Sequence, residues 1–411
     1  MDDPVQETIT VDLHDMAHGG EAVGRLEDGR AIFVAGGIPG EKVEVRLVRE
    51  KKRWARGELV SVIEASEDRV TPPCPFVGDC GGCQWQHIAL PRQRTLKREI
   101  IAGQLGHLAG LADAQVEETV GVGDEDGFGY RNHVHLSVDE AGQTGYYRSG
   151  SREPVPVDSC LLLHPLLREW QEKLPPLPGA HRVELRAGTR TFQRLAMFRG
   201  YIEESAGEES YQRGIPLGRA GEGELTEMVG VERYRISSKS FFQVNTDGAE
   251  KLVELALEML DVDDSTTVMD AFAGVGLFSI PLGRVASKVW AVERHPAALR
   301  DLRHHAEKMK DKIHIVGTEM QDAFTQLPGR VDRVLADPPR EGLTESVVEG
   351  ILGLQPEKIV LVACDPASLA RDAKGIIEGG YQLERVVPVD LFPHTYHIEA
   401  VALFGRGLGE E

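Results

Sequence analysis

The stretch LVACDPASLARD, Leu361 to Asp372, decides how the chain is interpreted. It continues an apolar run that starts at Lys358 and predicts a buried strand of a parallel sheet. The strand ends at Cys364, and a helix then begins near Pro366, because proline is well tolerated in the first helical turn. Open α/β sheets bind ligands at the carboxyl ends of their strands, and a helix N-terminus favours a thiolate over a thiol. Cys364 is therefore a candidate nucleophile, although a lone cysteine in such a run is more often a buried apolar residue.

Strands alternate with helices on both sides of this stretch, from about residue 266 to the end of the chain. We expect strands at 267–269, 289–292, 313–316, 333–336 and 359–363, helices at 296–309 and 366–377, and two closing strands at 383–391 and 397–404. This alternation predicts an α/β, Rossmann-like domain with a doubly wound parallel sheet and helices on both faces. With the helix expected at 249–260, it spans residues 233–411.

The composition limits the kind of protein. The 411 residues are 41% hydrophobic, which is enough for two or three domains with ordinary cores. No signal peptide or membrane-spanning run is evident, so we expect a cytoplasmic monomer without membrane contact. A formal net charge of −20 argues against a nucleic acid as partner. A local basic patch can nevertheless coexist with an acidic remainder.

Residues 1–64 alternate short strand-like runs with glycine turns, which predicts a small OB-like β-barrel. The barrel contains the basic run KKRWAR, with Lys51, Lys52, Arg53, Trp54 and Arg56. Such a run can neutralise phosphates and offer an aromatic ring on which a base stacks. The alternative is an ordinary solvated hairpin.

Residues 65–232 are expected to form a second, α+β domain, with a helix at 91–108 that packs on the third domain. We expect the acidic segment 203–209 to be a solvated turn. Cys74, Cys80 and Cys83 follow the spacing C-x5-C-x2-C, and Cys160 lies downstream. Four thiolates can hold zinc or an iron–sulfur cluster, and spacing alone does not separate the two.

A nucleoside-binding turn is predicted after the first strand of the third domain. The segment 270–277 contains Gly274 and Gly276, and the second strand ends at the acidic Glu293. A strand, a glycine turn, a helix, a strand and an acid together hold a nucleoside by its ribose hydroxyls. Both NAD and S-adenosylmethionine fit this pattern, and a plain tight turn is the alternative.

Two further acids stand at the expected ends of strands. Asp337 is followed by Pro338 and Pro339, which lock the backbone into a rigid path that presents a polar group to a planar target such as a base edge. Glu399 enters an apolar strand, where burial of a carboxyl is costly and raises its pKa into a range suited to proton transfer. Alone, Glu399 is more often a surface residue.

Together these motifs resemble the 5-methyluridine RNA methyltransferases, and the resemblance covers essentially the whole chain. The residues that carry it are Cys74, Cys80, Cys83 and Cys160; Phe241 to Asn245; Asp270 to Gly276; Asp337 to Gly342; Ala363 to Asp372; and His397 to Glu399. The resemblance implies an RNA-binding TRAM barrel, a [4Fe-4S] cluster on the four cysteines and S-adenosylmethionine contacts at Gln243, Phe272, Glu293 and Asp337. It also implies that Cys364 is the nucleophile and Glu399 the base. One departure is Asp365, where the family commonly has Asn, and a carboxylate there would raise the thiol pKa unless it is turned away or paired.

The chemistry explains why these groups are needed together. Carbon 5 of uracil becomes nucleophilic only after a thiolate adds to carbon 6, and a base must later remove the carbon 5 proton. We expect Asp337 to position the target base and Arg131 to contact RNA. The predicted product is 5-methyluridine in 23S ribosomal RNA, with the T-loop of transfer RNA as the alternative substrate. A cluster-containing RNA-binding protein without catalysis is the alternative of another class.

Overall fold

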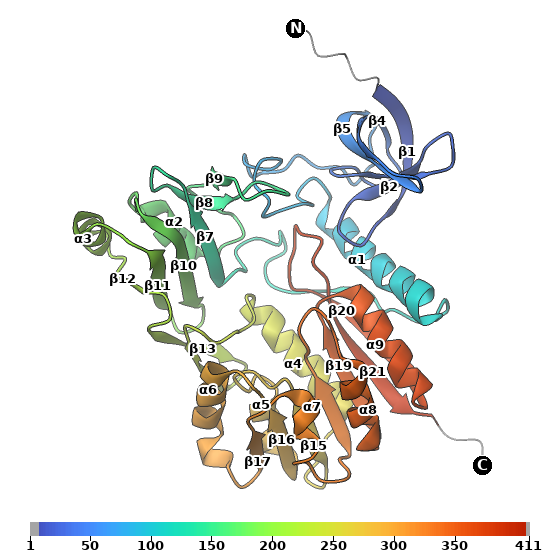
Figure 1. Cartoon of the computed structure of the whole chain (residues 1–411), viewed down its shortest axis with the longest axis vertical. Helices are drawn as coiled ribbons and strands as arrows, with labels where there is room; N and C mark the ends of the chain where they lie inside the picture. Colours follow the sequence, from blue (N-terminus) through green and yellow to red (C-terminus); the bar gives the residue numbers. More distant parts are fainter. Residues whose placement is uncertain (1–7, 408–411) are drawn as a thin grey trace.

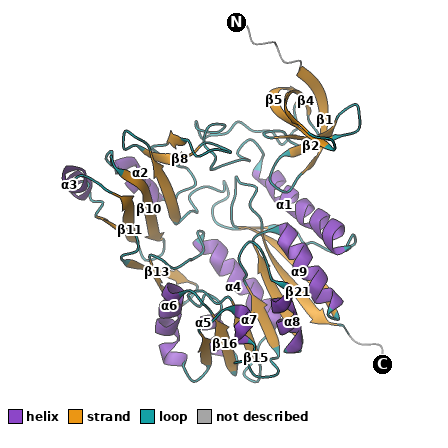
Figure 2. Ribbon diagram, in the orientation of Figure 1, coloured by secondary structure: helices purple, strands orange, loops and turns teal. Residues whose placement is uncertain are grey.

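The computed structural model describes residues 8–407, so the outermost residues of the first and third expected domains, 1–7 and 408–411, lie outside the described part. Figure 1 shows a blue barrel at upper right, a green sheet at upper left, and a large yellow-to-red sheet with its helices below them. We call the green sheet the central sheet. The ribbon in Figure 2 shows that much of the chain between the barrel and the central sheet is loop.

The first part is a closed five-stranded barrel in the order β1-β2-β3-β5-β4. Its strands are β1 (Thr8–Met16), β2 (Ala22–Arg25), β3 (Ala31–Val34), β4 (Lys42–Glu50) and β5 (Trp54–Glu64). Alternate residues point inward, as a barrel requires, and Val43 and Val45 of β4 are fully buried. β4 pairs with both β1 and β5, which closes the barrel, so the predicted barrel is confirmed.

A long irregular segment then leads to α1 (Leu90–Gln104), which ends in the π-helical turn η1 (Leu105–Ala109). α1 and η1 pack against α9 (Pro366–Glu378) of the large sheet, and the short strand β6 (Val120–Gly121) joins that sheet beside β20 (Tyr381–Asp390). The helix expected at 91–108 is therefore present and lies on the third part of the molecule.

The central sheet has six strands in the order β12-β11-β10-β7-β8-β9. These are β7 (His133–Val138), β8 (Thr144–Tyr147), β9 (Pro154–Pro156), β10 (Ala180–Gly188), β11 (Gln193–Gly200) and β12 (Leu217–Arg219). Its two helices are α2 (Pro165–Lys173) and α3 (Glu204–Gln212). The expectation of a turn at 203–209 was wrong, because Glu204 suits a helix N-terminus and Ala206 and Ser210 are buried on the inner side of α3.

A two-stranded hairpin, β13 (Glu224–Val229) and β14 (Glu232–Ser237), connects the central sheet to the large sheet. Residue 233, where we expected the third domain to begin, therefore lies inside β14.

The large sheet has eight strands in the order β17-β16-β15-β18-β19-β21-β20-β6. Its strands besides β6 are β15 (Thr267–Ala271), β16 (Lys288–Val292), β17 (Ile313–Val316), β18 (Arg333–Ala336), β19 (Lys358–Ala363), β20 (Tyr381–Asp390) and β21 (Glu399–Arg406). Strands β15 to β19 are parallel, as predicted. The expectation of a wholly parallel sheet was wrong at one place: β21 returns from β20 and inserts antiparallel between β19 and β20, because the connection between them is too short for a parallel crossover.

Helices cover both faces of the large sheet, as predicted. They are α4 (Thr246–Leu260), α5 (Ser279–Val285), α6 (Pro296–Ala306) with the short 3-10 turn η2 (Glu307–Met309), α7 (Met320–Ala323), α8 (Glu345–Gly353) and α9 (Pro366–Glu378). Alternate strand residues explain the two layers: Val360 and Val362 of β19 pack in the core with α4 to α6, whereas Ile359 and Leu361 pack in the core with α1 and α7 to α9. The second of these cores is continuous with the interior of the barrel.

Among the described helices, each is too short or too polar to cross a membrane.

Candidate active site

Five of the predicted motifs meet at one edge of the large sheet. β15, β16, β18 and β19 run in the same direction, so the residues that follow them, Phe272, Glu293, Asp337 and Cys364, all stand at the carboxyl edge. β21 runs the opposite way and begins at this edge with Glu399, because Ala400 pairs with Ala363. The register of the sheet therefore places both the predicted nucleophile and the predicted base on adjacent strand ends.

Cys364 is a half-buried thiol surrounded mainly by acids. Burial raises the pKa of Cys364 to about 12, and the carboxyl groups of Glu399 and Asp337 contribute to the rise. The guanidinium of Arg340 acts in the opposite direction, and Asp365 makes the smallest contribution. The thiol form is thus favoured in the empty site, and a positive charge is needed nearby before Cys364 becomes a good nucleophile.

Glu399 is almost completely buried, with 2% of its surface exposed. Its Oε1 atom has no hydrogen-bond partner among the described residues. Burial, and to a smaller extent the charge of Asp337, raises the pKa of Glu399 well above its usual value. A buried carboxyl left without a partner destabilises the fold, so Glu399 is a candidate for a functional role and not a stabilising one.

Asp337 directly follows β18, and burial raises its pKa to about 7. The charge of Asp337 disfavours the ionised forms of Cys364 and Glu399, and Glu399 disfavours that of Cys364. The site therefore holds less negative charge at neutral pH than three independent acids would.

Arg340 is a site residue to which the sequence assigned no role, although it lies within the motif Asp337 to Gly342. Its Nη2 donates a hydrogen bond to Nδ1 of His397 over 2.9 Å. Burial and the charge of Arg340 lower the pKa of His397 to about 4, so the imidazole is neutral and accepts this bond. Arg340 also opposes the rise in the pKa values of both Cys364 and Glu399. The signal in the sequence that could have identified Arg340 as a site residue is its position directly after Pro338 and Pro339.

Asp365, the departure from the family pattern, is occupied by other contacts. Its Oδ1 accepts hydrogen bonds from the backbone N–H groups of Ala367 (3.0 Å) and Ser368 (2.9 Å) at the start of α9. Its Oδ2 lies 3.2 Å from Nε2 of His18, in the loop between β1 and β2 of the barrel. The carboxylate is therefore both a helix N-cap and the partner of a barrel residue, so its effect on Cys364 is small.

The same barrel loop packs against the segment that leads to Glu399. A Cβ atom on Gly20 would come within 2.7 Å of Cβ of Tyr396, and the carbonyl oxygen of Gly20 accepts a hydrogen bond from Nε1 of Trp85 (3.1 Å). Gly20 has φ +84°, so two independent constraints require glycine there. Trp85 is fully buried, and its backbone N–H donates to the carbonyl oxygen of His394 (3.0 Å). The barrel is thus fixed directly to the candidate site.

The predicted nucleoside-binding turn has the expected shape. The backbone N–H of Gly274, at φ +58°, donates to Oε2 of Glu293 (2.8 Å), so that carboxylate lies across the glycine turn. A Cβ atom on Gly276 would meet Leu302 of α6 at 2.7 Å, which explains the second glycine. Phe272 has φ +64°, which is rare for a non-glycine residue. Backbone strain of this kind is concentrated at ligand-binding sites.

Gln243 and Arg131 lie on two segments whose backbones are joined by hydrogen bonds. Gln243 is 6% exposed, and within residues 8–407 its side-chain amide makes no hydrogen bond, whereas its backbone carbonyl accepts one from Asn132 (3.1 Å). The backbone of Arg131 pairs with that of Asn245, and its half-buried side chain contributes to the low pKa of His397. Both predicted residues therefore lie near the site.

The four cysteines of the predicted metal site come together in the structure. Burial raises the pKa of Cys83 to about 12, and the charges of Cys160, Cys80 and Cys74 contribute to the rise. The loop that carries three of them approaches the central sheet closely: the N–H of Gly81 donates to the carbonyl oxygen of Tyr147 (2.9 Å).

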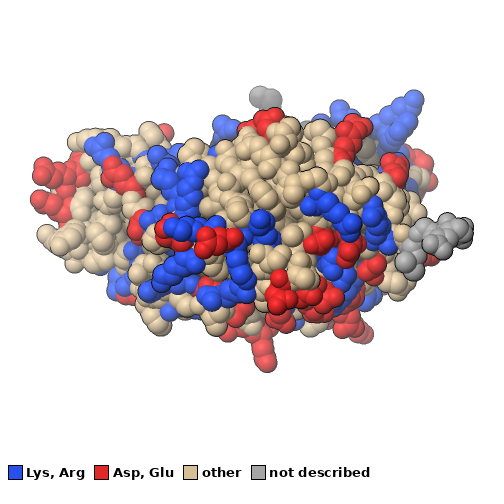
Figure 3. Space-filling view, turned by 90° about the horizontal axis from the view of Figure 1, so that it is seen from below, with Lys and Arg blue, Asp and Glu red and all other residues tan. Residues whose placement is uncertain are grey.

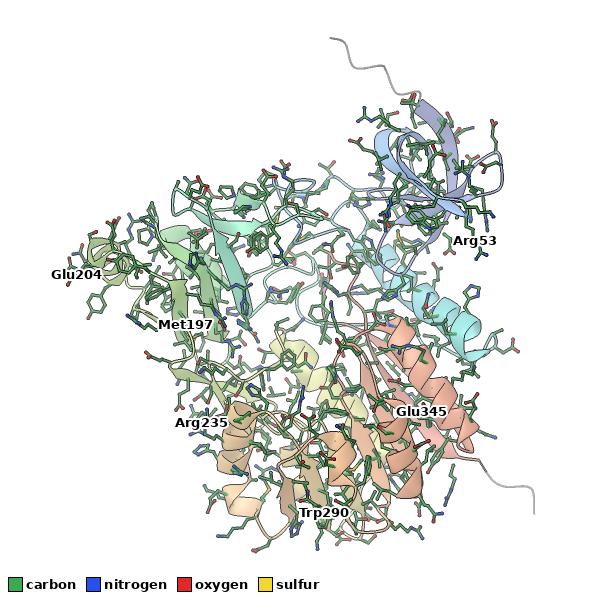
Figure 4. The ribbon with its side chains drawn as sticks, in the orientation of Figure 1. Arg53, Met197, Glu204, Arg235, Trp290 and Glu345 are labelled. Atoms are coloured by element: carbon green, nitrogen blue, oxygen red, sulfur yellow. The ribbon has the colours of Figure 1, made fainter. Side chains whose placement is uncertain are left out.

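The basic run of the barrel is not part of this edge. Figure 4 shows Arg53 on the flank of the barrel that faces away from the central sheet, which is marked there by Met197. Lys51, Lys52, Arg53 and Arg56 are exposed, but Arg56 is paired with Glu21 (2.9 Å). The guanidinium groups of Arg49 and Arg56 lie 5.5 and 5.6 Å from the centre of the Trp54 ring. A base that stacks on Trp54 would have to compete with these cations.

Comparison with known proteins agrees with this geometry. A family model for tRNA (uracil-5-)-methyltransferases matches residues 225–406, and one for the TRAM domain matches residues 5–60. An uncharacterized RNA methyltransferase of Gloeobacter violaceus is 35% identical, with 97% of each chain covered. The 23S rRNA (uracil(1939)-C(5))-methyltransferase RlmD of Salmonella choleraesuis is 33% identical over 98% of this chain and 97% of the relative.

Among solved structures, the tRNA (uracil-54, C5)-methyltransferase of Pyrococcus abyssi, in complex with S-adenosyl-L-homocysteine, shares the fold with a TM-score of 0.74. That match covers 96% of this chain and 100% of the other, at 23% identity. The chain therefore belongs to the RNA (uracil-C5-)-methyltransferase family, a class of methyl-transferring enzymes. Its barrel is a TRAM domain.

Proposed function

We propose that this enzyme methylates carbon 5 of a uridine in 23S ribosomal RNA through a covalent bond between Cys364 and carbon 6, with S-adenosylmethionine as methyl donor. The observation that carries the proposal is the meeting of Cys364, Glu399 and Asp337 at one edge of the sheet, next to the Gly274 turn. A thiol, a carboxyl base and a nucleoside pocket are the groups that this reaction requires.

In the proposed reaction, the Cys364 thiolate bonds to carbon 6, and the carbon 5–carbon 6 double-bond electrons pass into an enolate. Carbon 5 then bonds to the methyl group as the sulfur–methyl bond of the donor breaks. The Glu399 carboxylate removes the carbon 5 proton, the carbon 6–sulfur bond breaks, and the thiolate returns.

The proposed steps require the thiolate of Cys364 and the carboxylate of Glu399. Cys364 and Glu399 both favour their neutral forms in the empty site, and the charge of Glu399 disfavours the thiolate. Arg340 is the cation that favours their ionised forms. We infer that Arg340 is the group that favours the thiolate of Cys364 over its thiol. Asp337, with a pKa raised to about 7, can hold the polar edge of the target base in either protonation state.

The residues around the glycine turn fit S-adenosylmethionine, which supplies an electrophilic methyl group when bound. Glu293 offers a carboxylate for ribose hydroxyls, and the buried amide of Gln243 has free donors and acceptors within the described residues. Phe272 presents a half-buried aromatic ring beside the turn.

The four thiols Cys74, Cys80, Cys83 and Cys160 fit a [4Fe-4S] cluster, which would join the irregular loop to the central sheet. Across residues 8–407, only His133, His135 and Glu184 bring three ligand atoms within 4.8 Å of one another, so no three of these sulfurs do. Tetrahedral zinc with bonds of about 2.3 Å needs its sulfurs roughly 3.8 Å apart. The cluster is the group that the resemblance of the sequence implies, and iron and acid-labile sulfide analysis of anaerobically purified protein separates it from zinc.

The choice of 23S ribosomal RNA rests on the relative from Salmonella choleraesuis, which is more similar in sequence than the archaeal enzyme that acts on transfer RNA. Transfer RNA remains the second candidate substrate. The decisive assay incubates the protein with labelled S-adenosylmethionine and either unmodified 23S ribosomal RNA or transfer RNA, and maps 5-methyluridine by mass spectrometry. We expect one or more methylated uridines in the 23S sample. Methylation of transfer RNA alone would mean that transfer RNA, and not 23S ribosomal RNA, is the substrate. Methylation of neither RNA would contradict the proposal.

A second experiment tests the role of Glu399. Glu399→Gln should retain methyl transfer to carbon 5 but fail to release the enzyme, so a covalent protein–RNA adduct should accumulate on a denaturing gel. The same variant with Cys364→Ala should form no adduct. An adduct in the double variant would mean that another residue is the nucleophile.

A further inference from the structure

The central sheet carries a cleft of about 770 Å³ on the side that faces the large sheet. It is lined by strands β7, β10, β11 and β12, by residues 220–221, by the segment 238–241 that leads to Gln243, and by His295, which lies two residues after Glu293. The cleft is therefore adjacent to the cofactor side of the candidate active site. A strand of RNA that leaves that site in this direction would lie along it.

The cleft is basic, although the whole chain has a net charge of −20. Arg199, Arg219 and Lys239 line it and are exposed, and none has a carboxylate partner within the described part of the chain. Charge is also unevenly distributed on the face seen from below in Figure 3, where blue side chains gather left of centre and red ones along the lower edge. The overall charge thus says little about this surface.

The one carboxylate among the residues that line the cleft, Glu184, is already neutralised. Its Oε1 accepts hydrogen bonds from Nε of the buried Arg186 (3.0 Å) and from Nε2 of His133 (2.9 Å). The lining therefore keeps an excess of positive charge.

His133, His135 and Glu184 also have the composition of a metal site, with three ligand atoms within 4.8 Å of one another. The surroundings oppose a divalent cation. Arg186 donates a hydrogen bond to Oε1 of Glu184, and Nη1 of Arg182 lies 3.2 Å from Nδ1 of His135. The charge of Arg199 also helps to lower the pKa of His135. Three guanidinium groups around one imidazole favour an anion over a metal ion.

Two further features suit a polynucleotide. Phe241, which lines the cleft and lies two residues before Gln243, is 69% exposed, so a base can stack on its ring. Lys239 lies over Gly221, where a Cβ atom would come within 2.4 Å of the lysine Cε. Gly221, at φ +94°, thus leaves the room that the lysine side chain occupies.

We propose that this cleft is a binding groove for the phosphate backbone of the substrate RNA, separate from the pocket for the target uridine. The proposal rests on RNA being the substrate, and it assigns phosphate contacts to Arg199, Arg219 and Lys239. Such contacts position the RNA strand and carry no sequence information.

The test compares the triple variant Arg199→Gln, Arg219→Gln, Lys239→Gln with the control Lys308→Gln, Lys310→Gln, Arg330→Gln. The control removes the same charge at the opposite edge of the large sheet. Binding of a fluorescein-labelled oligouridylate of about 20 nucleotides and of a 23S ribosomal RNA transcript is measured by fluorescence anisotropy from about 50 to 300 mM salt. The groove variant should bind both RNAs at least about tenfold more weakly, and the slope of log affinity against log salt should fall by about 2 to 3. The control should match the wild type.

In methyl transfer, the groove variant should raise KM for RNA and leave kcat within about twofold, with unchanged affinity for S-adenosylhomocysteine by calorimetry. Equal salt slopes for the wild type and the groove variant would overturn the proposal. A second pair of results would also overturn the proposal. In it, the wild type binds Zn²⁺ or Mn²⁺ tightly and His135→Ala does not, while the groove variant binds RNA as tightly as the wild type. A wild-type enzyme that methylates no uridine would contradict the proposed function only, because the binding measurement does not depend on turnover.

Discussion

Cys364 and Cys83 are half-buried thiols with the same raised pKa, about 12, and burial is the main cause in both. Their surroundings differ. The neighbours of Cys364 are carboxyl groups with a single opposing guanidinium, on the rigid ends of adjacent strands. The neighbours of Cys83 are three other thiols, and Cys83 itself lies on a loop without regular secondary structure. The pKa alone therefore does not separate a nucleophile from a metal ligand, whereas the identity of the neighbouring groups does.

The largest expected effect on activity comes from removal of the Cys364 thiol. Cys364→Ala should reduce methyl transfer by at least about 1,000-fold, because it removes the proposed nucleophile and with it the covalent bond to carbon 6. Iron and acid-labile sulfide in the anaerobically purified variant should equal those of the wild type. Residual transfer near the wild-type rate would show that Cys364 is not the nucleophile.

Cys83→Ala should affect the metal site and leave the reactivity of Cys364 unchanged. We expect loss of iron and acid-labile sulfide and a lower melting temperature, because a bound cluster contributes its binding free energy to the folded state. Alkylation of Cys364 by iodoacetamide, followed by peptide mass spectrometry, should proceed as in the wild type. An unchanged iron content would remove Cys83 from the metal site.

Arg340→Gln tests the cation that distinguishes the two thiols. Arg340 lowers the pKa of Cys364, so its loss should raise that pKa and move the rising limb of activity against pH toward alkaline values. At a fixed pH below the thiol pKa, the thiolate fraction and the rate should fall about tenfold for every pH unit by which the limb moves, and the difference should shrink as the pH rises. Arg371→Gln, on α9, is the control, since its Nη2 only donates to the carbonyl oxygen of Glu341. A pH-independent loss would indicate a structural role for Arg340.

The smallest effect is expected at Asp365. Asn can still cap α9, so Asp365→Asn should lose only the half-exposed contact to His18, worth at most about 1 kcal/mol. Removal of the carboxylate charge should lower the pKa of Cys364 slightly and raise its rate of alkylation by no more than about threefold. Asp365→Ala should cost about 1 kcal/mol more, because the cap is lost as well. A large loss of activity in Asp365→Asn would mean that the His18 contact positions the nucleophile.

Much of the fold was predictable because it depends on local patterns. The apolar runs that end at Ala336 and Ala363 identified β18 and β19, and parallel strands necessarily bring their carboxyl ends to one edge. This is why the position of Cys364 and Asp337 at that edge was predictable from the sequence. The position of β21, by contrast, depends on pairing between distant segments, and nothing in its own residues distinguishes an inserted antiparallel strand from an edge strand.

The contacts of Arg340 and His18 at the site were not predicted for the same reason, since they too depend on segments that are distant in the sequence. Arg340 comes near Cys364 and His397 only after β18, β19 and β21 have assembled. His18 meets Asp365 because the barrel docks on the large sheet, and that contact is invisible in the sequence around either residue. α3 was missed because an acidic composition favours exposed turns and exposed helices alike.

The fixed position of the TRAM barrel has a consequence for target choice. The loop around Gly20 is held between Tyr396 and Trp85, so the barrel cannot swing away from Cys364 without breaking this packing. On the proposed function, with RNA bound by the barrel, a uridine reaches Cys364 only if it lies at a set separation from the RNA segment that contacts the barrel. Selection of one uridine among many would follow from that spacing, and lengthening the loop at Gly19 would shift the site of modification along the RNA.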